Sequence, residues 1–505
     1  MRVSSELVTR ERRRCRKRLH QHQNQMLSRS SRGERDEASS LSPAGGPAIL
    51  SGNDKPARIP GRKRTALMSE FHLPLHSVDV IPKPALDGIT IDFRDTTGTD
   101  LLGRWDRVHD WFGSRLRFGL DPYGKRTRAR IAPECTATLR DGSGAVTGVN
   151  FASQDYLNLA SHPSICTAAI EAINQYGVHS AGSAALMGDT LLADLLERRI
   201  ASFLNMEDCT LLPTGWAAGY GAVRTLAGAG DHIIIDVLAH ACLQEGARCS
   251  GAQVHSFPHL SIDAVRRRLT RIRAEAPQAG ILVVTEGLYS MDSDTPDLRV
   301  LQALCSEFAA TLLVDVAHDL GSLGPGGRGA LGMQEMIGKV DVVMGSFSKT
   351  FASNGGFVAS RTSSLKTGLR YFCNPLTFSN ALSPVQAAIV LAAFDIVDSP
   401  EGDRRRADLL ANAIRLREGL ADQGFQLLGA PSAIVPVILG TNGYSRLMTR
   451  EAMRLGALVN LVEYPAVSRN GCRWRLQVMA DHSKEQIARM LEIASSARSA
   501  AEQYI

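Results

Sequence analysis

The 505-residue sequence has no long apolar run that is free of charges. A helix that crosses a membrane needs about 20 consecutive apolar residues, whereas the closest stretch, residues 387–397, is too short and contains Asp395. Internal repeats with periods of about 20–50 residues are missing too, which argues against solenoid and propeller folds. The sequence therefore predicts a non-repetitive protein without a transmembrane segment.

Cysteines in metal-binding spacing are also absent. The nine cysteines form no CxxC pair and no other metal-ligand pattern, so we expect no metal site. In a chain of this size they are typical of reduced thiols in a cytoplasmic protein. With 44% hydrophobic and 21% charged residues, the composition is ordinary for a globular fold.

Basic charge is concentrated at one end of the chain. Residues 1–67 hold 16 Lys/Arg and 6 Asp/Glu, while the whole chain has a net charge of +6, so the remaining residues are net acidic. This balance gives no support for nucleic-acid binding by the folded body. Binding of nucleic acid or an acidic membrane by residues 1–67 is left as a minor alternative.

Residues 1–67 are rich in Arg, Ser, Gln, Gly and Pro. Such a composition buries little apolar surface and predicts a disordered leader. The Arg and Ser content is compatible with a mitochondrial transit peptide, but the acidic residues argue against one. The other interpretation is an over-extended start, with Met68 as the true first residue.

Three short apolar runs lie between residues 311 and 360, and reactive side chains follow the first two. These side chains are Asp315 and His318 after the first run, and Ser346, Ser348 and Lys349 after the second. Runs of this length, with a helix-sized segment between the first two, predict buried parallel strands of an α/β fold. In such sheets ligands bind beyond the carboxyl ends of the strands, so we expect the reactive residues to meet there.

A carboxylate, an imidazole and a lysine at strand ends suit pyridoxal phosphate. The Lys349 amine can form a Schiff base with its aldehyde, and Asp315 can hold its pyridine nitrogen protonated. The His318 imidazole can hydrogen-bond its phenolic oxygen, and the small hydroxyl residues beside Lys349 can hold its phosphate. The alternative is a buried ion pair with an ordinary strand-end lysine.

The segments VDVAHDLG (314–321) and GSFSKTFASNGGF (345–357) resemble the α-oxoamine synthases, the family of serine palmitoyltransferase, 8-amino-7-oxononanoate synthase and 5-aminolevulinate synthase. The resemblance extends over residues 103–493. It implies the fold-type I pyridoxal-phosphate transferase fold, α/β, with a mostly parallel seven-stranded sheet in the large domain and a small C-terminal α+β domain. It also implies a homodimer with active sites at the interface.

The resemblance assigns roles residue by residue. The catalytic residues implied are Lys349, His240, Asp315 and His318. Cofactor contacts are implied for Thr214, Gly215, Trp216, Ser290, Ser346 and Ser348, and for Ser379 in the partner's site. Lys349, Asp315 and His318 are implied cofactor contacts too, as is His240, whose ring is implied to stack on the pyridine face. Substrate contacts are implied for Arg475, on the amino-acid carboxylate, and for Gln154. Glu286 is implied to be an acid that supports the site without contacting the ligand directly.

The implied domains are a leader (1–67), an N-terminal arm that packs across the dimer (68–150), a large cofactor-binding domain (151–397) and a small domain (398–505). The implied reaction is the decarboxylative condensation of a small amino acid with an acyl thioester of CoA or of an acyl carrier protein. The products are an α-amino ketone, carbon dioxide and a free thiol.

Three positions depart from the family pattern. Gln154 replaces an Asn, Ala184 an Arg and Ala193 a His, which leaves the amino acid and the acyl donor open. One alternative is the non-decarboxylating reaction of a 2-amino-3-ketobutyrate ligase. Another is a non-catalytic partner subunit, against which the presence of Lys349 argues.

Overall fold

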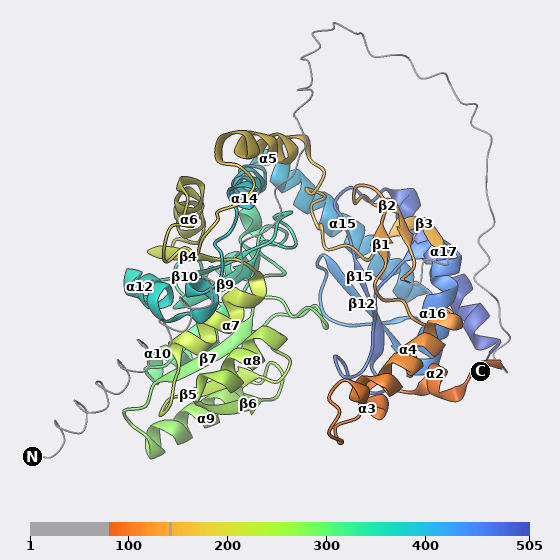
Figure 1. Ribbon diagram of the computed structural model, residues 1–505, viewed down its shortest axis with the longest axis horizontal. Coiled ribbons are helices and arrows are strands. Elements are labelled where there is room, and N and C mark those ends of the chain that lie inside the picture. The colour runs from red at the N-terminus through yellow and green to blue at the C-terminus, as the bar shows by residue number, and fades with distance from the viewer. Residues whose placement is uncertain (1–79, 141–143, 505) are drawn as a thin grey trace, which may run out of the picture. The chain divides into compact units, whose positions relative to one another are not determined.

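Seven strands form the sheet that bears the reactive residues (Figure 1), in the order β4-β10-β9-β8-β7-β5-β6. The computed structural model describes residues 80–140 and 144–504, so the leader, residues 68–79 and residues 141–143 lie outside the described residues. The strands are β4 (Asp208–Leu212), β5 (His232–Asp236), β6 (Gln253–Phe257), β7 (Ile281–Glu286), β8 (Thr311–Asp315), β9 (Val342–Ser346) and β10 (Gly356–Ser360). Five of them run parallel from β6 to β9, as the sequence predicts.

The third apolar run corrects the expectation of parallel strands. It forms β10, which is antiparallel to both β9 and β4. Only residues 347–355 connect β9 to β10, and a parallel crossover needs a dozen residues or more. The chain therefore turns straight back, and this short return contains Lys349.

Alternate strand residues enter two separate apolar cores. Ile233 and Ile235 pack in one core with helices α7 (Gly215–Leu226) and α8 (Ala241–Ser250), whereas Ile234 packs in the other. Burial of both faces explains why these strands are apolar along their whole length. The helices that supply the second core include α6 (Leu191–Leu204), α9 (Ile262–Glu275), α10 (Leu298–Glu307) and α14 (Pro384–Val397).

Two smaller sheets involve the C-terminal part of the chain. One has the order β11-β12-β15-β14, and the other, β1-β2-β3-β13, joins it to the arm. Their bounds are β1 (Arg126–Thr127), β2 (Glu134–Thr138), β3 (Ala145–Asn150), β11 (Gln426–Leu427), β12 (Ile434–Gly440), β13 (Ala457–Leu458), β14 (Leu461–Val462) and β15 (Cys472–Gln477). The adjoining helices are α15 (Pro400–Asp422), α16 (Asn442–Arg454) and α17 (Lys484–Glu502).

The remaining helices are short or lie in the arm. They are α2 (Lys83–Asp87), α3 (Thr90–Phe93), η2 (Gly103–Trp105), α4 (Asp106–Arg117), α5 (Pro163–Tyr176), η3 (Pro325–Gly327), α11 (Gly329–Met333), α12 (Ser363–Phe372) and α13 (Asn374–Thr377). In the described ranges, no helix is both long and apolar enough to cross a membrane. We keep the domain limits at 150 and 397 as a proposal.

A buried ionic cluster joins the arm to the C-terminal part of the same chain. Glu463 accepts from Arg115 at 2.8 Å and from Arg446 at 2.6 Å, and all three are buried. Arg446 also donates to the carbonyl of Leu86 at 2.6 Å. These contacts hold the arm on its own chain, and its packing across a dimer stays a prediction of the resemblance.

A second ionic cluster ties together two loops at the carboxyl end of the large sheet. The His259 ring nitrogens lie 3.0 Å from Asp236, at the end of β5, and 3.1 Å from Asp294, in the loop after β7. Burial alone would lower the pKa of His259, but the hydrogen bonds to the two carboxylates outweigh it and raise that pKa to about 10. The imidazolium therefore bridges two carboxylates through the neutral pH range.

This bridge predicts a pH-dependent stability difference. The folded-state pKa of His259 lies above the unfolded value of about 6.5, so its contribution is complete below pH 6.5 and is lost as pH rises to about 10. We expect the gap in unfolding free energy between wild type and His259→Gln to shrink across this window. Urea unfolding of both proteins at several pH values measures the gap, and a constant gap would contradict the charged bridge.

Candidate active site

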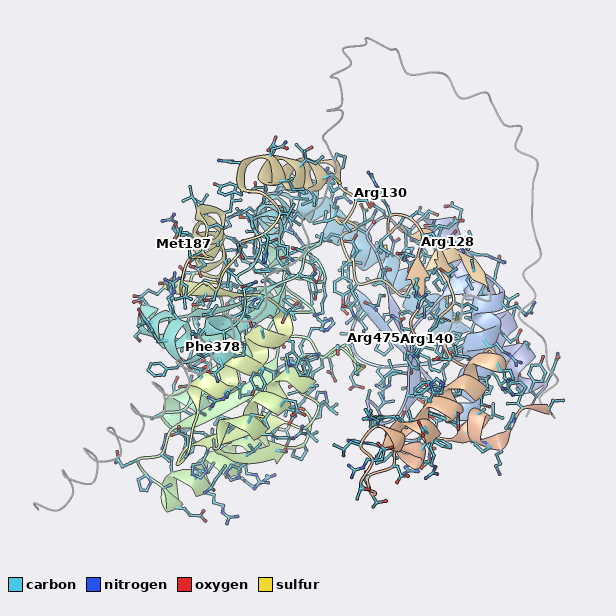
Figure 2. All side chains as sticks on the ribbon, viewed as in Figure 1. Arg128, Arg130, Arg140, Met187, Phe378 and Arg475 are labelled. Atoms are coloured by element: carbon cyan, nitrogen blue, oxygen red, sulfur yellow. The ribbon has the colours of Figure 1, made fainter. Side chains whose placement is uncertain are left out.

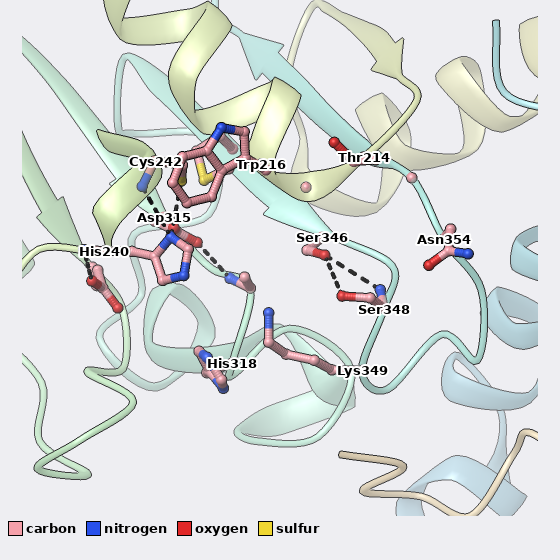
Figure 3. A pocket seen from close by; sticks show the side chains of 15 residues that line it. Thr214, Trp216, His240, Cys242, Asp315, His318, Ser346, Ser348, Lys349 and Asn354 are labelled. Atoms are coloured by element: carbon pink, nitrogen blue, oxygen red, sulfur yellow. Dashed lines mark hydrogen bonds between the residues drawn. The ribbon is translucent and has the colours of Figure 1, made fainter. Parts of the chain in front are cut away.

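A cavity of about 220 Å³ opens at the carboxyl ends of β8 and β9 (Figure 3). The predicted site residues that line it are Thr214, Gly215, Trp216, His240, Asp315, His318, Ser346, Ser348 and Lys349. They come from strand ends and helix starts spread over more than a hundred residues of sequence. The topology brings them together because all these strand ends meet at one edge of the sheet.

Lys349 points its amine into the middle of this cavity (Figure 3). Burial lowers the pKa of Lys349, the cation of Arg475 lowers it further, and Asp315 acts in the opposite direction. A lysine with a lowered pKa presents more of its neutral amine, which is the nucleophilic form.

Asp315 is 5% exposed and ends strand β8. Its Oδ1 accepts the N–H of Ala317 at 2.8 Å. Burial raises its pKa, while the nearby His240 and Lys349 lower it. Within the described residues, no cation forms an ion pair with this carboxylate inside 4.0 Å. A buried carboxylate without such a partner favours a cationic ligand group beside it.

The two imidazoles of the cavity are both held in the neutral form. Burial, with Lys349 and Arg475 nearby, lowers the pKa of His318 well below its usual value, and its Nδ1 lies 2.9 Å from the Tyr156 hydroxyl. Burial also lowers the pKa of His240, and Lys349 and Arg475 add to this against Asp315. Neutral imidazoles can each offer one N–H donor and one acceptor to a ligand.

His240 is fixed from two sides at the start of α8. Its backbone N–H donates to Glu286 Oε1 at 2.6 Å, and its Nδ1 accepts the N–H of Cys242 at 3.3 Å, with the Cys242 Sγ at 3.0 Å. The Trp216 ring stands edge-on, with centroids 6.0 Å apart. Burial, reinforced by Asp315, raises the pKa of Glu286 well above its usual value.

An anion-binding end is built on the first turn of α7. Thr214 caps this helix by accepting the N–H of Ala217 at 3.0 Å. Gly215 and Trp216, whose N–H groups belong to the first turn and so have no partner within the helix, line the cavity. The Ser346 and Ser348 hydroxyl oxygens lie 2.8 Å apart. A Cβ at Gly215 would stand 2.3 Å from Ser346 Oγ, so only glycine lets the two walls approach this closely. A helix N-terminus lined by hydroxyl groups is suited to phosphate.

Gln154 lies in a second, more open cavity of about 440 Å³. This cavity shares Lys349, Ser348 and Asn354 with the first, so the two meet at the lysine. Gln154 therefore faces the space in front of the reactive amine.

The structure places the other predicted residues outside the lining of both cavities. Arg475, on β15, still lowers the pKa of Lys349, His240 and His318 by its charge. Its buried Nε has no hydrogen-bond partner among the described residues. Ser290 lies in the loop after β7, and Ser379 follows α13 next to Phe378, which is 83% exposed (Figure 2). Their roles as cofactor contacts stay predictions.

Sequence reasoning missed three residues that complete the site, Tyr156, Cys242 and Asn354. Tyr156 and Cys242 stand in the segments around Gln154 and His240 that were already singled out. Nothing in these segments indicated that the two side chains support the imidazoles. Asn354 lies in the return from β9, whose tight geometry the sequence did not predict.

Comparison with known proteins identifies the family. Residues 146–493 match the aminotransferase class I and II family. The 8-amino-7-oxononanoate synthase of Geobacter metallireducens is 34% identical over 74% of this chain and 93% of its own length. The 2-amino-3-ketobutyrate coenzyme A ligase of Escherichia coli is 34% identical over 72% of this chain and 89% of its own length.

Among solved structures, the serine palmitoyltransferase of Sphingomonas wittichii superposes with a TM-score of 0.74 at 30% identity, covering 80% of this chain and all of that one. The chain therefore belongs to the aminotransferase class I and II family and, within it, to the α-oxoamine synthases, which are pyridoxal-phosphate-dependent acyltransferases.

Proposed function

We propose that this enzyme condenses a small amino acid with an acyl thioester, releasing carbon dioxide, a free thiol and an α-amino ketone. The observation that supports it most is the cavity in which the Lys349 amine faces Asp315 and two neutral imidazoles, with the Arg475 guanidinium nearby. Each of these groups has a task in making and stabilising charge at the α-carbon of an amino acid.

The residues of the cavity fit pyridoxal phosphate. Thr214, Gly215, Ser346 and Ser348 form a cradle that suits its phosphate, and the buried Asp315 carboxylate suits its protonated ring nitrogen. Lys349 would hold its aldehyde, and His318 its phenolic oxygen. When bound, the cofactor supplies an electron sink for the charge that forms at the α-carbon.

The proton transfer belongs to Lys349. Its lowered pKa provides a neutral amine that can take the α-proton of the substrate and return it later. The Arg475 guanidinium, with its buried Nε unpaired among the described residues, is suited to bind the carboxylate of the amino acid. His240, fixed by Glu286 and Cys242, can donate to the same carboxylate.

The acyl thioester would enter through the second cavity, which leads from the surface to Lys349.

The resemblance implies that Ala184 and Ala193, two of the positions that depart from the family pattern, lie near the thioester entrance. In the structure both line a very small cavity together with Asp189 and Glu197. Arg370 and Lys366 already pair with these carboxylates. The donor is a thioester of CoA or of a carrier protein.

A 2-amino-3-ketobutyrate ligase-type reaction remains the second candidate, because a relative of that name is as similar as the 8-amino-7-oxononanoate synthase. Measuring carbon dioxide release from a carboxyl-labelled amino acid separates the two reactions. A non-catalytic partner subunit is disfavoured, since Lys349 and its surrounding groups are all in place.

We further propose a cytoplasmic homodimer. Large apolar side chains are exposed on the segments near Ser379 and α6, including Met187 at 90% and Phe378 at 83% (Figure 2). Exposed apolar groups of this kind are typical of association surfaces. Pairing there would bring Ser379 toward the partner's phosphate cradle. The described cysteines are all free thiols, which fits a reducing compartment.

Replacing Lys349 tests the role of the amine. Lys349→Ala removes the amine that we propose moves the α-proton, so turnover should fall by about 10²–10⁴-fold or more, with the far-UV circular dichroism unchanged. The exposed Lys339→Ala is the matched control. Product formation by mass spectrometry is the measurement, and near-wild-type activity of Lys349→Ala would overturn the proposal.

Replacing Gln154 tests whether this residue contacts the side chain of the amino-acid substrate. Gln154→Asn shortens the side chain by one methylene in front of Lys349, a change worth about 1–3 kcal/mol between competing substrates. We expect the ratio of kcat/KM values among glycine, alanine, serine and larger amino acids to change, while the absorption spectrum of the bound cofactor stays constant. Equal scaling of all substrates would show that Gln154 does not contact the side chain.

A further inference from the structure

Three arginines lie in one short segment beside the second cavity. Arg126, Arg128 and Arg130, here called the arginine strip, are all exposed. Arg126 belongs to β1, which is the edge strand of its sheet. Arg128 and Arg130, labelled in Figure 2, lie in the loop between β1 and β2. The strip therefore presents positive charge on an open edge and not inside a pocket.

The strip has no internal neutralisation in the described structure. None of its three guanidinium groups has a carboxylate within 4.0 Å among the described residues, whereas exposed arginines elsewhere, such as Arg266 and Arg271, pair with Glu307 and Glu275. Residues 125–140 contain five basic residues and one acidic residue. Since the chain after residue 67 is net acidic, this is a local concentration of positive charge.

The strip adjoins the path to the reactive lysine. Ile131, directly after Arg130, lines the second cavity together with Gln154 and Lys349. Thr127, inside the strip, lines a third cavity of about 260 Å³ that shares Ser153 with the second. A partner bound to the strip would therefore lie at the mouth of the cavity that ends at Lys349.

We propose that the acyl donor is delivered by an acidic carrier protein that docks on the arginine strip and inserts its thioester arm into the second cavity. This inference rests on the proposed condensation and specifies its second substrate. Docking itself makes and breaks no covalent bond. It raises the local concentration of the thioester in front of Lys349.

Geometry favours a protein over a nucleotide as the group that the strip contacts. The chain bends at Arg128 and Ala129 after β1, so Arg126 and Arg130 lie at most about 13 Å apart, the length of four steps of extended chain. Two turns of a helix are about 11 Å long. An acidic helix can place carboxylates along such a length. The nucleotide part of a small thioester is instead expected in a concave site, and the strip is an exposed edge.

Exposed charges of this kind act mainly on encounter and specificity. Their effect is screened with a Debye length of about 10 Å at 0.1 M salt. The docking should therefore change KM for the carrier-bound donor and its salt dependence, and leave kcat unchanged.

The experiment compares three acyl donors, which are thioesters of the same long acyl chain with a bacterial acyl carrier protein, with CoA and with N-acetylcysteamine. Each donor is assayed with cofactor-loaded enzyme. The variant is R126E/R128E/R130E, and the matched control is R94E/R117E/R267E, whose arginines are likewise exposed, have no carboxylate within 4.0 Å among the described residues, and line neither cavity. Binding of the acylated carrier protein is measured separately by fluorescence anisotropy, which needs no turnover.

We expect the strip variant to raise KM and Kd for the carrier protein by about 10-fold or more at low salt, corresponding to about 1.4 kcal/mol. Its kcat and its KM for the two small donors should match wild type and the control. In wild type, KM for the carrier protein should rise between about 50 and 200 mM salt, and the variant should lose this dependence.

Two results would overturn the docking proposal. One is an unchanged Kd and KM for the carrier protein in the strip variant. The other is an equal rise in KM for acyl-CoA with the N-acetylcysteamine donor unaffected, which would assign the strip to the phosphates of CoA. Failure of the condensation itself looks different, because wild type would bind the carrier protein through the strip and yet form no amino ketone from any donor.

Discussion

The buried carboxylate of Asp315 is the constraint on which the site depends. A charge taken out of water is costly unless a cation stands beside it, and the described chain provides His240 and Lys349 nearby but no ion pair within 4.0 Å. The burial that raises the pKa of Asp315 also lowers the pKa of Lys349 and of His318. Burial in one cavity therefore acts on a carboxylate and, beside it, on an amine whose neutral form it favours.

The groups around this cavity are held by contacts that extend across the large sheet to the C-terminal sheet. His240 depends on Glu286 at the end of β7, and the loop after β7 is fixed by His259 through Asp294. On its other side the same loop accepts from Arg473, whose guanidinium contacts Asp292 at 2.6 Å. Arg473 stands two residues before Arg475 on β15. The loop therefore connects the side of the cavity that holds His240 to β15, the strand that carries Arg475. These two parts of the site are far apart in the sequence.

Much of this arrangement was predictable, because strand ends followed by reactive residues are visible as a local pattern. Asp315, His318 and Lys349 could be located from apolar runs alone, and the resemblance added His240 and the helix start at Gly215. The direction of β10 was not predicted, since it depends on the length of a connection and not on apolar character. Tyr156 and Cys242 escaped because their roles arise from distances between segments, which no single stretch of sequence contains.

The short return between β9 and β10 also has a consequence for how the site forms during folding. Ser346, Ser348, Lys349 and Asn354 all lie within it or at its start, and closing so short a loop costs little chain entropy. This part of the site is built from contacts that are near in sequence, which form readily. Asp315, His240 and Arg475 must instead be recruited over long separations. Lys349 and its hydroxyl neighbours are therefore positioned by local contacts, whereas the remaining groups of the cavity join them through contacts between distant parts of the sequence.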